Sequence, residues 1–257
     1  MSVLDSIIEG VREDLANRRK PLSEIHDQMS QAPRALDAHA ALFGEQMKVI
    51  AEVKRSSPSK GELSKIADPA ALAEQYQSAG ASVISVLTEE RRFKGSLDDL
   101  AAVRSRVTIP ILRKDFMIDE YQFFEARAYG ADLILLIVAA LSKSQLKDFY
   151  DVATELGMAA LIEVHTADEL ERALEISPQI VGVNSRNLKT LEVDPAAFAD
   201  LIPRIPSTLI RVAESGISSR ADVEFAQSAG ANAILVGEAL VTSGEPTLAM
   251  RRLLGQG

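Results

Sequence analysis

Short runs of β-branched and aliphatic residues alternate with longer amphipathic segments, and this alternation constrains the fold more than any other feature of the chain. Eight such runs follow one another from residue 48 onward. Runs that are apolar throughout are typical of parallel strands covered on both faces, and the segments between them are typical of crossover helices. The expected strands are residues 48–53, 82–87, 110–113, 132–138, 159–164, 180–184, 209–213 and 233–236.

Each expected strand is followed by a segment with helical spacing. The helices are expected to begin near Pro69, Leu97, Glu120, Ser144, Ala167, Pro195, Ser219 and Thr247. Eight β-α units in a chain of 257 residues match the usual size of a (β/α)8 TIM barrel, which is about 250 residues. A doubly wound open sheet is the rival α/β fold, but it usually has fewer units and often a GxGxxG fingerprint, which does not occur here.

Residues 1–47 precede the first expected strand and form a helical N-terminal extension of the single barrel domain expected for residues 1–257. Leu4, Ile7, Ile8, Val11 and Leu15 recur at helical spacing, and acidic residues interrupt any apolar core of the kind that signal peptides have. We therefore expect a helix beside the barrel mouth. The basic run at residues 18–20 is interpreted as no more than a charge cluster at the end of this helix.

The composition limits the partners of the chain. A formal charge of -9 and a pI near 5.0 disfavour nucleic acid and anionic membrane surfaces. The longest apolar run, residues 133–141, is shorter than the about 18 to 20 residues that span a bilayer. Because cysteine is absent and only three histidines occur, a metal site is not expected, and we predict a soluble, cytoplasmic monomer.

Polar and charged residues gather where the expected strands end. Catalytic groups of barrel enzymes lie at the carboxyl ends of the strands. The side chains at these positions include Glu52, Lys54, Lys114, Glu163, His165, Asn184, Arg186, Glu214 and Ser215. Since side chains alternate along a strand, Glu52 and Lys54 point the same way and share the mouth.

Lys54 alone fits equally well as a solvated loop lysine or as one half of an ordinary ion pair with Glu52. Lys114 and the further carboxylates change this balance, because so many desolvated charges are costly in a core that serves only stability. The set therefore indicates a functional site. His165 is interpreted more simply, as a loop histidine or one that lies behind the reacting groups.

Glycines follow the last two expected strands. Gly216 and Gly237 stand just before helices, where backbone amides can bind an anion, and the corresponding loops of barrels often hold phosphate. The alternative is that these glycines only permit tight turns. We assign Gly216, Gly237 and Glu238 to a phosphate region, although the Glu238 carboxylate would compete with a phosphate unless it points to solvent.

The strand-end motifs can also be compared with known families as a set. They are IAEVKRSSPSKG (50–61), LRKDF (112–116), LIEVH (161–165), VGVNSRNL (181–188), VAESGI (212–217) and ILVGEAL (234–240). In this order they closely resemble the indole-3-glycerol phosphate synthase family of tryptophan biosynthesis. The resemblance covers essentially the whole chain, including the N-terminal extension.

The resemblance implies a reaction. The family closes the ring of 1-(2-carboxyphenylamino)-1-deoxyribulose 5-phosphate, with loss of carbon dioxide and water, and forms indole-3-glycerol phosphate. It implies a phosphorylated small-molecule substrate and no cofactor or metal.

The resemblance also implies roles for individual residues. Lys114 would be the general acid that protonates the ketone, Glu163 would serve the later dehydration, and Lys54 with Glu52 would hold the substrate carboxylate and assist proton transfer. The remaining assignments are Asn184, Arg186, Glu214 and Ser215 for orienting the substrate, Ser57, Gly216 and Gly237 for its carboxylate or phosphate, and Phe93 and Phe116 for its aromatic ring.

Two other functions stay open at this stage. A Schiff-base aldolase also needs a barrel lysine, a nearby carboxylate and a phosphate site, and a non-catalytic phosphate-binding barrel would need only the last of these. A related barrel that isomerises a phosphoribosyl anthranilate uses a cysteine base, which this chain lacks.

Overall fold

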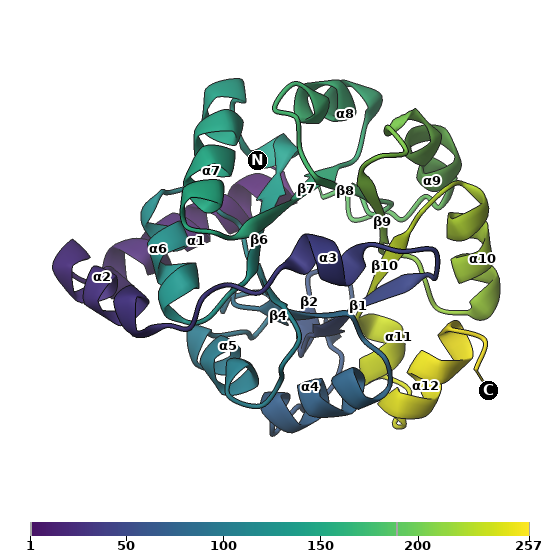
Figure 1. The fold of residues 1–257 in the computed structure, drawn as a ribbon, viewed down its shortest axis with the longest axis horizontal. Helices are drawn as coiled ribbons and strands as arrows, with labels where there is room; N and C mark the ends of the chain where they lie inside the picture. The colour runs from purple at the N-terminus through teal and green to yellow at the C-terminus, as the bar shows by residue number, and fades with distance from the viewer. Residues whose placement is uncertain (1, 189, 257) are drawn as a thin grey trace.

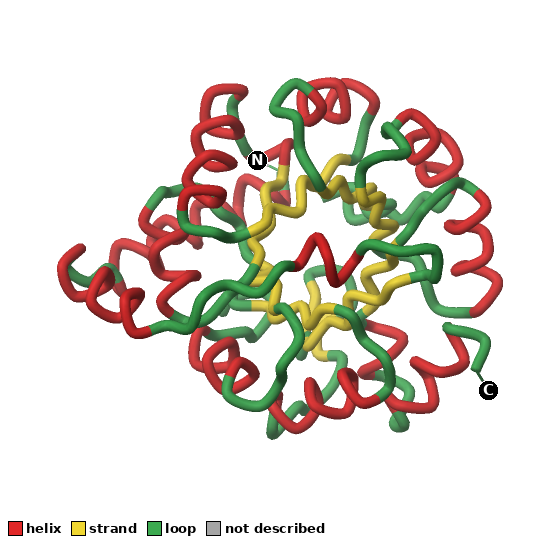
Figure 2. Tube along the Cα trace, viewed as in Figure 1, coloured by secondary structure: helices red, strands yellow, loops and turns green. Residues whose placement is uncertain are grey.

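The core of the structure is a closed barrel of parallel strands surrounded by helices, as the alternating sequence pattern predicts. A computed structural model describes residues 2–188 and 190–256. Within these residues eight strands close in the order β1-β10-β9-β8-β7-β6-β5-β4, and β4 pairs again with β1. Figure 2 shows the ring of strands with most of the helices outside it and one short helix across its open end. The predicted (β/α)8 fold is confirmed.

The barrel strands lie close to their predicted positions. Their bounds are β1 (Lys48–Val53), β4 (Val83–Leu87), β5 (Ile111–Lys114), β6 (Leu133–Ile137), β7 (Ala159–Val164), β8 (Ile180–Asn184), β9 (Ile210–Glu214) and β10 (Ala233–Val236). Two strands run one residue further than expected, to Lys114 and Glu214. These charged ends continue the ladder because their side chains meet partners inside the mouth, which a hydropathy pattern does not register.

The helices that follow the strands begin within one residue of the predicted positions. They are α4 (Pro69–Ser78), α5 (Leu97–Arg104), α6 (Tyr121–Ala128), α7 (Lys143–Glu155), α8 (Ala167–Leu174), α9 (Ala196–Leu201), α10 (Arg220–Ser228) and α12 (Pro246–Leu253). Side-chain caps explain several of these starts, since Ser96, Ser142, Thr166 and Ser219 each accept a backbone N–H bond from the first helical turn.

Several short elements have no counterpart in the sequence prediction. They are the hairpin of β2 (Ser56–Ser57) and β3 (Gly61–Glu62), and the 3-10 turns η1 (Val138–Ala140) and η2 (Ile202–Arg204). The hairpin strands and the 3-10 turns have only two or three residues each, too few for a repeating hydrophobic pattern to be recognised. The short helix α11 (Glu238–Val241) begins directly after Gly237, as the sequence predicts.

Alternation along the strands divides the core into two parts. On β1, Val49, Ala51 and Val53 face the surrounding helices, whereas Ile50 belongs to the cluster inside the barrel. Glu52 lies two residues further along the strand than Ile50, so its side chain points to the same side and lies nearer the mouth. Aliphatic side chains therefore fill the barrel interior near the beginnings of the strands, and the charged residues form the layer at the carboxyl ends of the strands, which is the mouth.

The N-terminal extension reaches both ends of the barrel. It forms α1 (Val3–Arg18), α2 (Leu22–Gln31) and α3 (Ala38–Leu42). Leu4, Ile7 and Val11 of α1 and Leu42 of α3 all pack against the interior cluster. α3 lies across the end where the strands begin, whereas α1 lies behind the barrel in the same view, on the side of the mouth (Figure 1).

The interpretation of residues 18–20 as a simple charge cluster is wrong. Arg18 donates two hydrogen bonds to Glu125 of α6, of 3.0 and 3.1 Å, and the Arg19 guanidinium lies 4.9 Å from the centre of the Tyr121 ring. These contacts dock the end of α1 onto the barrel. Separations of about 100 residues hide such pairs from any local pattern.

Candidate active site

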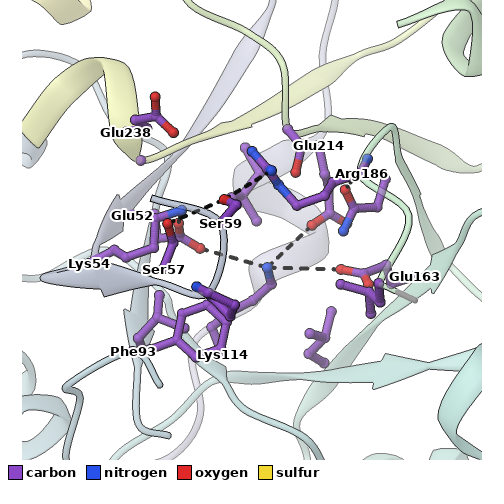
Figure 3. A pocket seen from close by; sticks show the side chains of 18 of the residues that line it. Glu52, Lys54, Ser57, Ser59, Phe93, Lys114, Glu163, Arg186, Glu214 and Glu238 are labelled. Carbon is purple, nitrogen blue, oxygen red and sulfur yellow. Dashed lines mark hydrogen bonds and ion pairs between the residues drawn. The ribbon is translucent and has the colours of Figure 1, made fainter. Parts of the chain in front are cut away.

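The mouth of the barrel holds one lysine surrounded by three glutamates. Lys114 ends β5, and its Nζ lies 3.7 Å from Glu52 Oε1, 3.6 Å from Glu214 Oε2 and 3.9 Å from Glu163 Oε2. The carboxylates come from β1, β9 and β7, so they converge from around the barrel (Figure 3). All three glutamates are buried, with exposed fractions of 1 to 2%.

Lys54 adds a second cation on the β1 side. Its Nζ lies 2.6 Å from Glu52 Oε2, which confirms the expected shared orientation of these two residues. Gly237 makes room for the pair, because a Cβ at this position would lie 2.5 Å from Glu52 Oε2. A glycine predicted for phosphate binding therefore also accommodates a carboxylate.

Gly182 provides a corresponding space two strands away from β10, across β9. It lies in the middle of β8, beside Glu163 of β7 in the strand register. A Cβ at Gly182 would lie 2.0 Å from Glu214 Oε1. The Glu214 carboxylate therefore occupies the gap that the missing side chain leaves.

The proximity of these groups shifts their pKa values in opposite directions. Burial acts to lower the pKa of Lys114, but the surrounding carboxylates, Glu52 foremost, outweigh it and hold this pKa above its ordinary value. Burial acts to raise the pKa of Glu52, yet Lys54 and Lys114 bring it below its ordinary value. Burial and the neighbouring Glu163 raise the pKa of Glu214 to about 8. At neutral pH the mouth thus combines a charged lysine with a largely protonated Glu214.

An aromatic and aliphatic wall faces these charges. Phe93 follows β4 and Phe116 follows β5, and their ring centres lie 6.2 Å apart with an interplanar angle of 39°. Ile7 of α1 and Leu135 of β6 line the same cavity. The cavity has an empty volume of about 1020 Å³, including its opening to solvent, so an aromatic ring and a polar chain fit side by side.

The other end of the cavity is formed by polar loops. Arg186 donates a 3.1 Å hydrogen bond from Nη1 to Ser59 Oγ of the hairpin, and its backbone N–H donates to Asn184 Oδ1 at 3.0 Å. Ser215 and Gly216 both have positive φ angles, of 65° and 71°, which turns the chain sharply after β9.

The Glu238 carboxylate has a partner within the protein and does not simply point to solvent, the arrangement that would avoid competition with a phosphate. It forms an ion pair with Lys60 of the hairpin. Its negative charge is therefore matched by a lysine, which reduces the expected competition with a phosphate.

All of the predicted site residues line this one cavity. They are Glu52, Lys54, Ser57, Phe93, Lys114, Phe116, Glu163, Asn184, Arg186, Glu214, Ser215, Gly216, Gly237 and Glu238. Their common location agrees with the sequence prediction, whereas their individual roles stay predictions. Over residues 2–188 and 190–256, no three or more His, Cys, Asp or Glu side chains are grouped so that they could hold a metal ion.

Comparison with known proteins connects this cavity to a family. A sequence model of indole-3-glycerol phosphate synthase matches residues 4–253. The chain is 55% identical over 258 residues to the indole-3-glycerol phosphate synthase of Mycolicibacterium vanbaalenii, covering 100% of this chain and 95% of that protein. It is 56% identical to that of Rhodococcus opacus, with 100% and 96% covered. The chain belongs to the indole-3-glycerol phosphate synthase family.

Solved structures outside the indole-3-glycerol phosphate synthase family share the fold alone. A crystal structure of 3-hexulose-6-phosphate synthase superimposes with a TM-score of 0.66 at 17% identity, covering 82% of this chain and 99% of that one. Thiamine phosphate pyrophosphorylase from Pyrococcus furiosus gives a TM-score of 0.62 at 14% identity, with 84% and 96% covered.

Three residues around the site of this synthase-family chain were given no functional role from the sequence. Gly182 belongs to the motif at residues 181–188, but the space that it leaves for Glu214 of the neighbouring strand β9 is visible only in the folded structure. Glu89, which follows β4, organises the loop that carries Phe93. His165 contacts Glu163 directly. Only the position of His165, two residues after Glu163 at a strand end, was a usable signal.

Proposed function

We propose that the chain closes the ring of 1-(2-carboxyphenylamino)-1-deoxyribulose 5-phosphate, releasing carbon dioxide and water, and so forms indole-3-glycerol phosphate in tryptophan biosynthesis. The observation that carries this proposal is the position of Lys114. Its ammonium group lies among three glutamates, in a cavity that also has apolar and aromatic lining residues and polar loop residues.

The first step needs a proton donor at the substrate ketone. The ring carbon that bears the carboxyl group attacks the ketone carbon, a carbon–carbon bond forms, and negative charge develops on the ketone oxygen. Lys114 suits this task because its raised pKa keeps the ammonium charged at neutral pH. In the buried mouth it supplies both electrostatic stabilisation and the proton.

The second step releases carbon dioxide and restores the aromatic ring. Lys54 would hold the carboxylate until this bond breaks, and Glu52 would orient Lys54 through their 2.6 Å contact. Phe93 and Phe116 would hold the ring between condensation and decarboxylation.

The third step removes, as water, the hydroxyl group that the first step created, together with a proton from the adjacent carbon that bears the nitrogen. Glu163 lies on the far side of Lys114 from Glu52 (Figure 3), so it would serve proton transfer at this stage. Arg186, Ser215 and Gly216 line the polar end of the cavity and would bind the glycerol phosphate end of the molecule.

The raised pKa of Lys114 also separates this proposal from a Schiff-base aldolase. An aldolase lysine must be an uncharged amine when it attacks a carbonyl group. The acidic neighbours of Lys114, Glu52 foremost, oppose that state and favour a proton donor.

The proposal extends to the setting of the enzyme. We propose that it works in the cytoplasm as a monomer without nucleic-acid partners, supported by the absence of cysteine and the charge of -9. No helix within the described residues has the length and hydropathy that crossing a membrane requires. We further propose that residues 1–257 form one domain, supported by the packing of α1 and α3 against the barrel interior.

The direct test is to mix the purified chain with the carboxyphenylamino-deoxyribulose phosphate, without added metal or cofactor, and to follow indole absorbance and fluorescence. The chain contains no tryptophan, so the protein background is low. We expect product formation that falls about 10² to 10⁴-fold in Lys114→Ala, with the melting curve close to wild type. Tight binding without turnover in the wild type would indicate a non-catalytic barrel instead.

A further inference from the structure

His165 lies between Glu163, the residue proposed to serve the dehydration step, and a second glutamate, Glu169. It directly follows β7, and its Nε2 lies 3.4 Å from Glu163 Oε1. Its Nδ1 lies 3.1 Å from Oε2 of Glu169 on α8. The histidine and Glu163 side chains are 8% and 2% exposed. The imidazole therefore bridges two carboxylates in a nearly dry environment.

The helix that follows holds this bridge in place. Thr166 caps α8, and Glu169 stands in its first turn. Glu169 Oε2 also accepts the backbone N–H of His165 at 2.7 Å. Because backbone and ring nitrogen meet the same carboxylate oxygen, rotation of the imidazole would break the Nδ1 contact.

Charged groups from three elements surround the imidazole. Burial acts to lower the pKa of His165, and the Lys114 ammonium on β5 acts in the same direction. Glu169 on α8 and Glu163 on β7 outweigh both, so the pKa of His165 lies above its ordinary value. A protonated imidazole donates from both nitrogens, which matches two carboxylates on opposite sides of the ring.

The two oxygens of Glu163 then have different neighbours. Oε2 faces Lys114 at 3.9 Å. Oε1 and the His165 Nε2 that lies 3.4 Å from it are both buried, and neither has a hydrogen-bond partner among the described residues, so each is the nearest polar group that can pair with the other. An unpaired buried carboxylate oxygen is costly, so without His165 the carboxylate would rotate toward another donor.

We propose that His165, held by Glu169, is a positioning residue that binds Glu163 Oε1 and thereby keeps Glu163 Oε2 directed at Lys114 and the substrate. It contacts no reacting atom itself. This inference rests on the proposed function, since it concerns the group that serves the dehydration step. It also makes a claim about the ligand-free protein, namely that the pKa of His165 lies above its ordinary value.

The ligand-free claim is tested by an NMR titration of the histidine rings. The chain has three histidines, and the His165→Gln spectrum assigns the signal. We expect a midpoint above the ordinary value of 6.5, lowered in Glu169→Gln because one of the two flanking charges is removed. A wild-type midpoint at or below 6.5 overturns the proposal, whether or not the chain turns over the substrate.

The kinetic test compares three variants with the wild type. In His165→Ala we expect kcat to fall about ten- to a hundredfold, the size of effect that small misplacements of a reacting group cause, with KM changed less than about twofold. His165→Gln retains a donor and should recover part of kcat. His39→Gln is the control, because this histidine stacks on Phe43 and belongs to α3, which lies across the opposite end of the barrel from the mouth (Figure 1).

The pH profile separates positioning from a structural role. Above the pKa of His165, the neutral ring keeps its proton on Nδ1 for Glu169 and turns a lone pair toward Glu163, so kcat should fall in the wild type. A Gln at this position donates at any pH, so the part of the basic limb that belongs to His165 should be absent from His165→Gln, whereas any part that belongs to Glu214, with its pKa of about 8, should remain in both proteins. If His165→Ala keeps kcat within twofold of wild type, or if His165→Gln keeps the same limb, the proposal fails. Product formation by the wild type remains the separate test of the proposed function.

Discussion

Gly182 determines where the Glu214 carboxylate can lie. Its missing side chain leaves a gap between β7 and β9, the two strands that pair with β8. A Cβ there would meet Glu214 Oε1 at 2.0 Å and Leu161 Cδ1 at 3.1 Å. The first distance is far too short for any real contact, so an added methyl group must displace the carboxylate.

We therefore expect Gly182→Ala to lower kcat by about a hundredfold, since a shift of about 1 Å near the reacting groups has an effect of that order. The measurement is a double-mutant cycle with Glu214→Asp, whose shorter side chain leaves the gap. Adding Gly182→Ala to Glu214→Asp should reduce kcat much less than adding it to the wild type. Equal reductions in both backgrounds would show that Gly182 does not act through Glu214.

At the scale of elements, the sequence predicts what is periodic and misses what is held by contacts across the fold. The barrel strands and the helices after them follow from apolar runs, caps and glycines, and their bounds differ from the prediction by a few residues at most. The site residues were found because they stand at strand ends in recognised motifs. The β2–β3 hairpin, the docking of Arg18 and the role of Glu89 depend on partners far along the chain or on loop geometry.

The loop after β4 shows such an arrangement in detail. Glu89 is 3% exposed, and its carboxylate accepts backbone N–H bonds from Arg91, Arg92 and Phe93, at 3.2, 2.7 and 2.9 Å. Burial outweighs these bonds and raises the pKa of Glu89 above its ordinary value. One carboxylate thus folds the loop that places Phe93 in the wall of the cavity.

Glu89→Gln should loosen this loop. The three N–H bonds use both carboxylate oxygens as acceptors, and a glutamine amide replaces one of these oxygens with a nitrogen that cannot accept a hydrogen bond. We expect KM to rise about tenfold, equivalent to about 1.4 kcal/mol, while kcat changes less, since the aromatic wall binds the substrate and does not transfer protons. Steady-state kinetics measure both constants. Glu90→Gln, at the exposed neighbouring position, is the matched control. A KM within twofold of wild type in Glu89→Gln would remove the assigned function of Glu89.

At the scale of the whole molecule, the raised pKa of Glu214 in the barrel mouth lowers the free energy of unfolding at neutral pH. The ordinary pKa of a glutamate is 4.5, whereas that of Glu214 is raised to about 8 in the folded chain. Between these values the folded protein binds a proton that the unfolded chain has already released. Stability therefore falls as pH rises through this window, because the folded state binds more protons than the unfolded state.

Glu214→Gln should remove this loss, since an amide resembles the protonated carboxyl group at every pH. We expect the variant to match the wild type near pH 5 and to exceed its free energy of unfolding at pH 8 by more than about 1 kcal/mol, because one pKa unit corresponds to about 1.4 kcal/mol and the pKa of Glu214 rises by more than one unit. Urea unfolding at pH 5, 6.5 and 8 measures this difference. Glu155→Gln, on the exposed face of α7, should follow the wild type throughout. The variant should also lose turnover, because residues that reduce stability at a site are retained for function. A difference that stays constant with pH would mean that Glu214 ionises in the folded protein much as it does in the unfolded chain, and that the mouth holds a third negative charge at neutral pH.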